Sequence, residues 1–142
     1  MRLVITTPTT ILLDAPDVRS VRAEDSSGAF GIQPGHADFL TALAIGVLIW
    51  RGADGGEHYA ALRGGVLRVR DGNWVEVATR EAIVGDDLKT LREVVIAQMI
   101  RNAEAEREAR MGALGLQRAA IQQIYRYLRP GEPPHDPLVK KR

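Results

Sequence analysis

The sequence contains no cysteine, so disulfide bridges and thiolate metal sites are excluded. Aromatic residues make up only 5% of the chain, too few for the stacking surfaces that bind single-stranded nucleic acid. The formal net charge is only +1, which argues against the dense basic face of a nucleic-acid-binding protein. No apolar run approaches the roughly 20 residues of a transmembrane helix, and the first residues lack the apolar core of a signal peptide.

What is present is the composition of an ordinary globular chain. Its 142 residues are 45% hydrophobic and 26% charged, which suits one domain or two small ones. The charge is uneven: residues 1–85 have more acidic than basic side chains, and residues 86–142 have the reverse. Because the residue pattern changes at the same point, we expect an α+β protein. A β-sandwich over 1–85 would precede a helical arm over 86–128 and a proline-rich, disordered tail over 129–142.

The first 85 residues contain short apolar or alternating segments separated by Gly, Pro, Asp or Asn, a pattern that predicts strands. The predicted strands are Arg2–Thr6, Thr10–Asp14, Val18–Ala23, Phe30–Ile32, Thr41–Ala44, Val47–Arg51, His58–Leu62, Gly65–Arg70 and Trp74–Ala78. Many short strands at this spacing indicate an antiparallel sandwich or flattened barrel.

Two hairpin turns are well marked, Asp54-Gly55-Gly56 and Asp71-Gly72-Asn73. In the strand before the second turn, Leu67 and Val69 alternate with two arginines, Arg68 and Arg70. Side chains alternate between the two faces of a strand, so we expect the apolar pair on a dry face and the arginines on a wet one. The Gly64-Gly65 pair is interpreted as a tight connection or bulge.

From Asp86 the apolar spacing changes to steps of three and four residues, which predicts a helix. Its first apolar line consists of Leu88, Leu91, Val95 and Met99. The adjacent acids Asp86 and Asp87 are suited to cap its start.

A second apolar line, Leu114, Ile121 and Leu128 with Ile124 between them, would form a narrow seam for another helix. We therefore expect two helical segments, separated near Gly112 and Gly115. Neither glycine has the Pro, Asn or Asp neighbours of a firm turn, so a helical hairpin and one long arm both remain open.

The segment from residue 28 to residue 43 combines turn-forming residues with apolar ones. Pro34 fixes one backbone angle and Gly35 permits left-handed geometry, so a tight turn can present His36. The apolar residues expected to anchor the turn are Phe30, Ile32, Phe39 and Leu40. The surroundings lack a second histidine at ligand spacing and a serine in a nucleophile setting, so we expect a contact surface and no reaction centre.

This segment resembles the signature of the epsilon subunit of F-type ATP synthases, which reads approximately Gly-x-x-Gly-Ile-x-Pro-Gly-His-Ala-x-x-Leu-Thr-x-Leu. The matching positions are Gly28, Gly31, Ile32, Pro34, Gly35, His36, Ala37, Leu40 and Thr41. The resemblance implies a non-catalytic central-stalk (rotor) subunit that couples ion flow through the membrane c-ring to ATP synthesis or hydrolysis. It also implies binding to the gamma subunit, and peripheral attachment, through partners only, at the cytoplasmic face of the bacterial inner membrane.

Two sets of contact residues follow from the resemblance. The turn would face the c-ring through Gly31, Pro34, Gly35 and His36. The helical arm, which in this family restrains ATP hydrolysis when extended, would meet the gamma subunit or the alpha and beta subunits of the catalytic head through Arg107, Arg110, Arg118 and Arg126. The alternative for these arginines is a solvated basic face with partners along the helix.

The chain departs from the family at two places. Ala29 stands where several relatives carry an acidic residue near the ring, and the chain lacks the Ile/Leu-Asp-x-x-Arg-Ala run that binds ATP in some relatives. These departures argue against a polar contact of position 29 with the c-ring and against a nucleotide sensor, so we expect no cofactor. The absence of cysteine and of a second histidine at ligand spacing predicts no metal site.

Two alternatives belong to other classes of function. One is a free-standing β-sandwich that binds a small ligand or peptide and oligomerises through its helical arm. The other, an enzyme, is disfavoured because Glu24-Asp25 and Asp86-Asp87 are adjacent pairs. Neighbouring side chains diverge on a strand or a helix, so these acids suit turns and caps better than a shared substrate.

Overall fold

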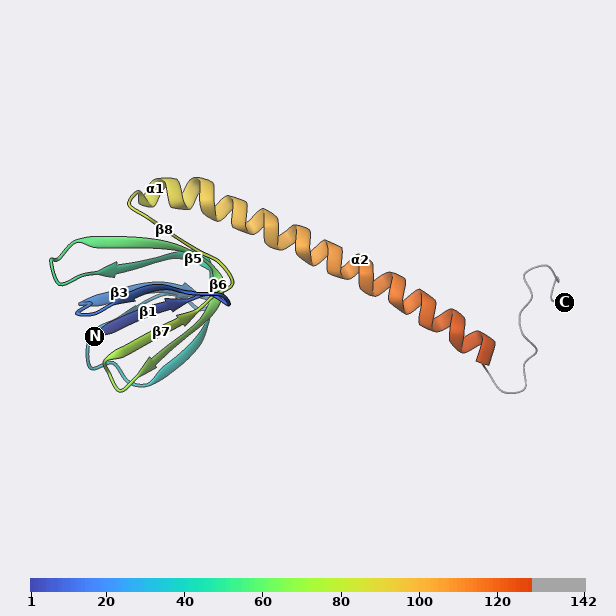
Figure 1. The fold of residues 1–142 in the computed structure, drawn as a ribbon, viewed down its shortest axis with the longest axis horizontal. Coiled ribbons are helices and arrows are strands. Elements are labelled where there is room, and N and C mark those ends of the chain that lie inside the picture. Colours follow the sequence, from blue (N-terminus) through green and yellow to red (C-terminus); the bar gives the residue numbers. More distant parts are fainter. Residues whose placement is uncertain (129–142) are drawn as a thin grey trace. The chain divides into compact units, whose positions relative to one another are not determined.

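The structure is a computed structural model that describes residues 1–128, with side chains to residue 125. Eight strands precede the helical part (Figure 1). The strands are β1 (Arg2–Thr6), β2 (Ile11–Ala15), β3 (Ser20–Asp25), β4 (Gly28–Ile32), β5 (Phe39–Arg51), β6 (Glu57–Arg70), β7 (Trp74–Ala78) and β8 (Ala82–Gly85). The helical part consists of α1 (Leu88–Thr90), the π-helical turn η1 (Leu91–Ile96) and α2 (Ala97–Leu128). The chain forms two compact units, the first ending at Arg101.

The strands hydrogen-bond in the order β2-β1-β7-β6-β5-β3-β4, with β8 added on β6. All pairs are antiparallel except β1 with β7, which run parallel. The two long strands belong to both layers of the sandwich. The first part of β5 pairs with the second part of β6 beside β7, and their other parts pair beside β3 and β8.

Strand β6 passes from one layer to the other near Gly65, where it comes very close to the end of β7. Gly65 has φ +124°, and a Cβ atom there would lie 2.2 Å from the carbonyl oxygen of Ala78. Every residue other than glycine would clash with that backbone. The predicted connection or bulge at Gly64-Gly65 was wrong, because both glycines lie inside the continuous strand β6 and its pairing with β5 shows no register shift there. Their role is still a geometric one.

The core lies between the two layers and follows the alternation of each strand. Fully buried side chains come from both layers, and they include Leu3, Ile5, Val21, Ile32, Leu48, Leu67, Val69, Val75 and Val77. In β6 the expected alternation is confirmed, because Leu67 and Val69 are buried whereas Arg68 is exposed and Arg70 half-buried. Burial of this interleaved apolar surface is the main term that stabilises a sandwich.

Several predicted strand limits were wrong. Thr41–Ala44 and Val47–Arg51 are parts of the single strand β5, and His58–Leu62 and Gly65–Arg70 are parts of β6. Glycines inside these strands look like interruptions in the sequence, but here they bend a continuous strand. Strand β8 was missed because its four residues show no clear alternation. Both hairpin turns were predicted correctly.

The helical part begins as predicted, with a carboxylate cap. The Asp87 side chain accepts hydrogen bonds from the Lys89 backbone N–H at 3.1 Å and from the Thr90 hydroxyl at 2.6 Å. Beyond the cap, Leu91 and Met99 are buried with Ala61 in a second, smaller core on the outer face of β5 and β6. Val95 joins this core, while Leu88 is only half-buried.

Helix α2 is continuous from Ala97 to Leu128, so the predicted break near Gly112 and Gly115 was wrong, and the long-arm alternative is the one that the structure adopts. The helix continues through both glycines because neither has a Pro, Asn or Asp neighbour that would favour a turn. Leu114, Ile121 and Ile124 are each more than half exposed, and the side chain of Leu128 lies outside the described residues. Among the described residues, no helix is long and apolar enough to cross a membrane. The predicted tail, residues 129–142, lies outside the described part of the chain.

Candidate functional site

The loop after β4 forms the tight turn that the sequence predicts. The backbone N–H of His36 donates to the carbonyl of Gln33 at 3.1 Å, and Pro34 and Gly35 occupy the two central positions. Gly35 has φ +87°. Proline followed by a glycine with positive φ is the requirement of a type II turn, which other residue types fit poorly.

A second turn, between β6 and β7, holds the first one in place. The N–H of Gly35 donates to the carbonyl of Gly72 at 2.9 Å, and the N–H of Asp71 donates to the Asp38 carboxylate at 3.0 Å. The approach is close, since a Cβ on Gly72 would lie 3.1 Å from the Gly35 Cα. The surface formed by Gln33–His36 is therefore part of the sandwich and is anchored on both sides. Of the predicted apolar anchors, Ile32 is buried, but Leu40 is 67% exposed, so its predicted anchoring role was wrong.

His36 is half-buried and its ring is oriented by neighbours on both sides. The ring makes an edge-to-face contact with Phe39 at 5.8 Å between centroids, and Phe39 makes another with Phe30 at 5.6 Å. The His36 Nδ1 lies 2.7 Å from the Ala37 carbonyl oxygen. A carbonyl can only accept, so Nδ1 carries the proton in this contact, and in the neutral ring Nε2 is left as an acceptor.

One open hollow of about 530 Å³ is lined by all four residues that the sequence predicts to contact the c-ring. Gly31, Pro34, Gly35 and His36 form one side, and strand β3 supplies Ser20, Val21 and Arg22 on the other. Gly31 pairs with Arg22 across β3 and β4, and the lack of a side chain on Gly31 leaves the guanidinium accessible. The hollow is shallow, which suits contact with another macromolecule better than enclosure of a small molecule.

Comparison with known proteins gives the same assignment as the turn. The family model described as ATP synthase, Delta/Epsilon chain, beta-sandwich domain matches residues 1–85. The chain is 43% identical over 130 residues to ATP synthase epsilon chain 2 of Paraburkholderia xenovorans, covering 92% of this chain and 94% of that one. The chain belongs to the ATP synthase epsilon family. ATP synthase epsilon chain 2 of Cereibacter sphaeroides is 42% identical over 128 residues, covering 90% of this chain and 88% of the relative.

Two solved structures share the fold of this chain at lower identity. A chain of the Euglena gracilis mitochondrial ATP synthase, in a structure of OSCP/F1/c-ring, aligns with a TM-score of 0.56 at 21% identity, covering 92% of this chain and 67% of that one. A chain of the Tetrahymena thermophila mitochondrial ATP synthase, in a structure of the central stalk and c-ring, aligns with 0.54 at 20%, covering 66% and 71%. At this identity the likeness concerns the fold.

The arginines predicted on the arm of this epsilon chain lie along α2. Arg107, Arg110 and Arg118 are exposed, and the side chain of Arg126 lies outside the described residues. With 3.6 residues per turn, the first three fall within about 80° of one helix face. The shared face is consistent both with a partner and with a solvated basic face, so the contact remains a prediction.

The two acidic pairs of the epsilon chain include the turn and cap residues that the sequence predicted. Asp25 accepts hydrogen bonds from the backbone N–H of Ser27 at 2.8 Å and from the Thr41 hydroxyl at 2.8 Å. Hydrogen bonds from Ser27 and Thr41 lower the pKa of Asp25, with the Ser27 hydroxyl as the largest cause. Asp87 caps the helix. Among the described residues, no group of three or more His, Asp or Glu side chains is placed to hold a metal ion.

Sequence reasoning missed the contribution of strand β3 to the site. The alternation of Ser20 and Arg22 with the buried Val21 and Ala23 could have placed the polar pair on the outer face. Their position beside Gly31 depends on the register of β3 with β4, which one sequence does not specify.

Proposed function

We propose that this chain is a non-catalytic central-stalk subunit of a rotary F-type ATP synthase, which couples ion flow through the membrane c-ring to ATP synthesis or hydrolysis. The match to ATP synthase epsilon chains over nine-tenths of the sequence carries this proposal. The sandwich contacts the c-ring and the gamma subunit, and it lies at the cytoplasmic face of the bacterial inner membrane, attached through these partners.

The mechanical role follows from the way in which the contact surface is built. A subunit that transmits torque needs contacts that do not yield when the neighbouring part turns. The turn at Gln33–His36 is cross-bonded to the turn at residues 71–73, and the two long strands β5 and β6 extend through both layers behind it. Such a body deforms less than a free loop, so rotation passes through it without a chemical step.

The test is assembly of the complex with variants of the turn. Gly35→Val places a β-branched side chain at φ +87° and should disturb the turn, whereas His36→Ala removes one side chain and keeps the backbone. We expect both variants to lower ATP-driven ion pumping, Gly35→Val more strongly, with urea unfolding midpoints that change proportionally less. Normal pumping, together with unchanged binding to the c-ring and gamma subunit, would contradict the proposed contact.

We also propose that the arm restrains ATP hydrolysis by contacts of Arg107, Arg110, Arg118 and Arg126 with the catalytic head or the gamma subunit. The exposed arginines on one face of α2 support this idea. Truncation after Arg101 keeps Leu91 and Met99 packed on the sandwich and removes the rest of the arm. We expect hydrolysis by the assembled complex to rise on truncation, and replacement of the four arginines by glutamine to reproduce part of the rise. An unchanged rate would reject the inhibitory role.

A further inference from the structure

A second hollow, of about 390 Å³, opens beside the site on the outer face of the sandwich. It shares Ser20, Arg22 and Gln33 with the first hollow, so the two form one continuous concave surface. Its remaining lining residues are Arg19, Ile49, Arg51 and Glu57. Three arginines thus surround a surface that has a single carboxylate.

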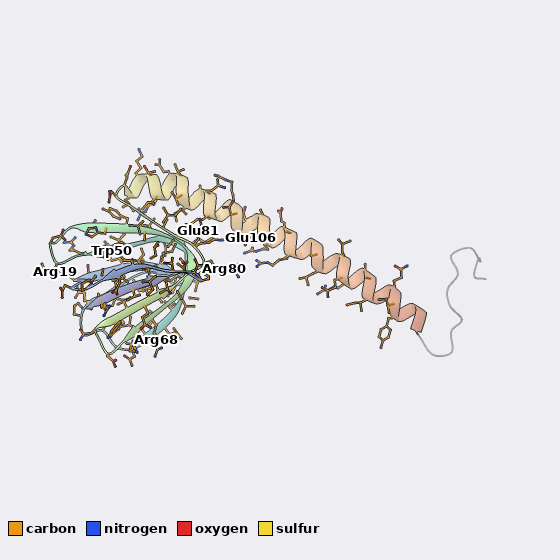
Figure 2. The ribbon with its side chains drawn as sticks, in the orientation of Figure 1. Arg19, Trp50, Arg68, Arg80, Glu81 and Glu106 are labelled. Atoms are coloured by element: carbon orange, nitrogen blue, oxygen red, sulfur yellow. The ribbon has the colours of Figure 1, made fainter. Side chains whose placement is uncertain are left out.

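Strand register explains why these side chains gather. Ser20 lies opposite Arg51 across β3 and β5, and Arg22 lies opposite Ile49. On the other side of β3, Arg22 lies opposite Gly31, which has no side chain to cover it. Side chains that are paired across neighbouring strands share one face, so Arg22 and Arg51 project from the same outer surface. Arg19 comes just before β3 and lines the same hollow. Figure 2 shows Arg19 at the left edge of the sandwich.

The one carboxylate is already engaged through both of its oxygens. Glu57 Oε1 accepts from Arg51 Nη2 at 3.0 Å, and Oε2 accepts from the Tyr59 hydroxyl at 3.1 Å. These two hydrogen bonds lower the pKa of Glu57, and the bond from Tyr59 is the larger cause. Glu57 is therefore ionised at neutral pH, and its charge balances that of one arginine. The guanidinium groups of Arg19 and Arg22 make no hydrogen bond and no ion pair within 4.0 Å among the described residues. The lining of the hollow therefore has an excess of about two positive charges.

We propose that this basic hollow receives a carboxylate-bearing segment of the protein that contacts the Gln33–His36 turn. The inference rests on the proposed function, because it names the chemistry of the partner at the same surface. Guanidinium groups bind planar carboxylates through paired N–H donors, while Ser20 and Gln33 offer neutral hydrogen bonds and Ile49 an apolar contact. These neutral and apolar walls suit a peptide chain. Lipid-binding patches instead cluster four or more Lys or Arg, whereas this hollow has three arginines beside one glutamate.

The test uses the full chain and membranes that contain the rest of the ATP synthase but lack this subunit. One variant combines Arg19→Gln with Arg22→Gln. The matched control combines Arg68→Gln with Arg92→Gln, two exposed arginines that line neither hollow. In Figure 2, Arg68 lies on the lower side of the sandwich, apart from Arg19. All four side chains are exposed, so both variants should fold as the parent does.

We expect the Arg19/Arg22 variant to bind the membranes about tenfold more weakly at low salt, with a smaller loss of affinity as salt is added. The control should bind as the parent does. Equal binding by the variant and the parent overturns the inference. If the parent itself fails to bind, the proposed function fails, a result distinct from the loss of this contact.

A second measurement separates protein from lipid as the source of the anion. The full chain is mixed with vesicles of phosphatidylcholine that contain phosphatidylglycerol, and separately with inorganic phosphate. We expect no vesicle binding that depends on Arg19 and Arg22, and no specific shift of their backbone NMR signals with phosphate. Vesicle binding that the variant loses, with binding to the complex unchanged, would assign the hollow to a lipid headgroup and overturn the proposal.

Discussion

The same types of apolar residue have opposite surroundings in the two compact units. In residues 1–101, Leu3, Leu67 and Met99 have no more than 1% of their surface exposed. On α2 beyond Arg101, Leu114 and Leu116 are 54% and 77% exposed. The first unit therefore gains its stability from its own packing, whereas the described part of the arm is held mainly by hydrogen bonds within the helix. The stability of a helix with exposed apolar side chains depends on contacts with other chains far more than that of a packed sandwich does.

The largest effect that would sharpen this comparison is expected from Gly65→Val. The new side chain would meet the Ala78 carbonyl at a backbone angle that β-branched residues avoid, in the region where β6 crosses between layers. We expect a loss of at least about 3 kcal/mol in the free energy of unfolding, or failure to fold. Urea denaturation of the full chain measures this. A stable variant would show that the close approach is not a constraint.

The next effect is expected from one substitution made in both units, Met99→Ala and Met111→Ala. Met99 is buried against Leu91 and Ala61, and its truncation should cost about 3 kcal/mol. Met111 is 66% exposed, so its truncation should change stability by less than about 0.5 kcal/mol. Hydrogen exchange should show faster exchange at the start of the helix in the first variant. Equal effects in the two variants would remove the distinction between the units.

A smaller effect of opposite sign is expected from Gly112→Ala combined with Gly115→Ala. Nothing lies within 4 Å of a Cβ built at either position, and neither glycine has positive φ. Alanine should therefore stabilise the helix by about 1–2 kcal/mol in total. Far-ultraviolet circular dichroism should show that the variant keeps more helix than the parent as the temperature rises. Decreased helicity would indicate a turn at these glycines and would favour the helical hairpin.

The smallest effect is expected at the helix start, from Asp87→Ala. The bond from Thr90 is the largest cause that lowers the pKa of Asp87 below its ordinary value of 3.8. A carboxyl whose pKa is lower in the folded than in the unfolded state stabilises the fold above the unfolded value, and this contribution is lost as pH falls through the folded value. The parent should therefore exceed the variant in urea midpoint above pH 3.8, and the difference should shrink below it. A pH-independent difference would contradict the role of the charge.

The sequence was informative where local rules decide the structure. The turn at Pro34 and Gly35 follows from the backbone preferences of two residues, and the cap at Asp87 follows from one carboxylate before an apolar helix line. The continuity of β5 and β6 could not be predicted in this way, because glycine inside a strand and glycine in a turn look alike until the partner strand is known.

Only one side of the candidate site could be predicted from the sequence. Its β4 side and turn come from one contiguous segment, which the resemblance identified. Its β3 side, with Ser20 and Arg22, depends on pairing between strands, and the second hollow depends further on the register of β3 with β5. Register is a property of the assembled sheet and of the packing behind it, so it is not contained in the order of residues in either strand alone.

The bond between the Gly35 N–H and the Gly72 carbonyl joins two points that lie 37 positions apart in the chain. Neither turn can be redesigned by itself. Any residue that adds bulk at position 72 displaces the Gly35 backbone, and the Asp38 carboxylate that follows the first turn holds the Asp71 amide of the second. Natural variation at these distant sites should therefore be correlated, and engineers who wish to retarget this surface must alter both turns in a single step.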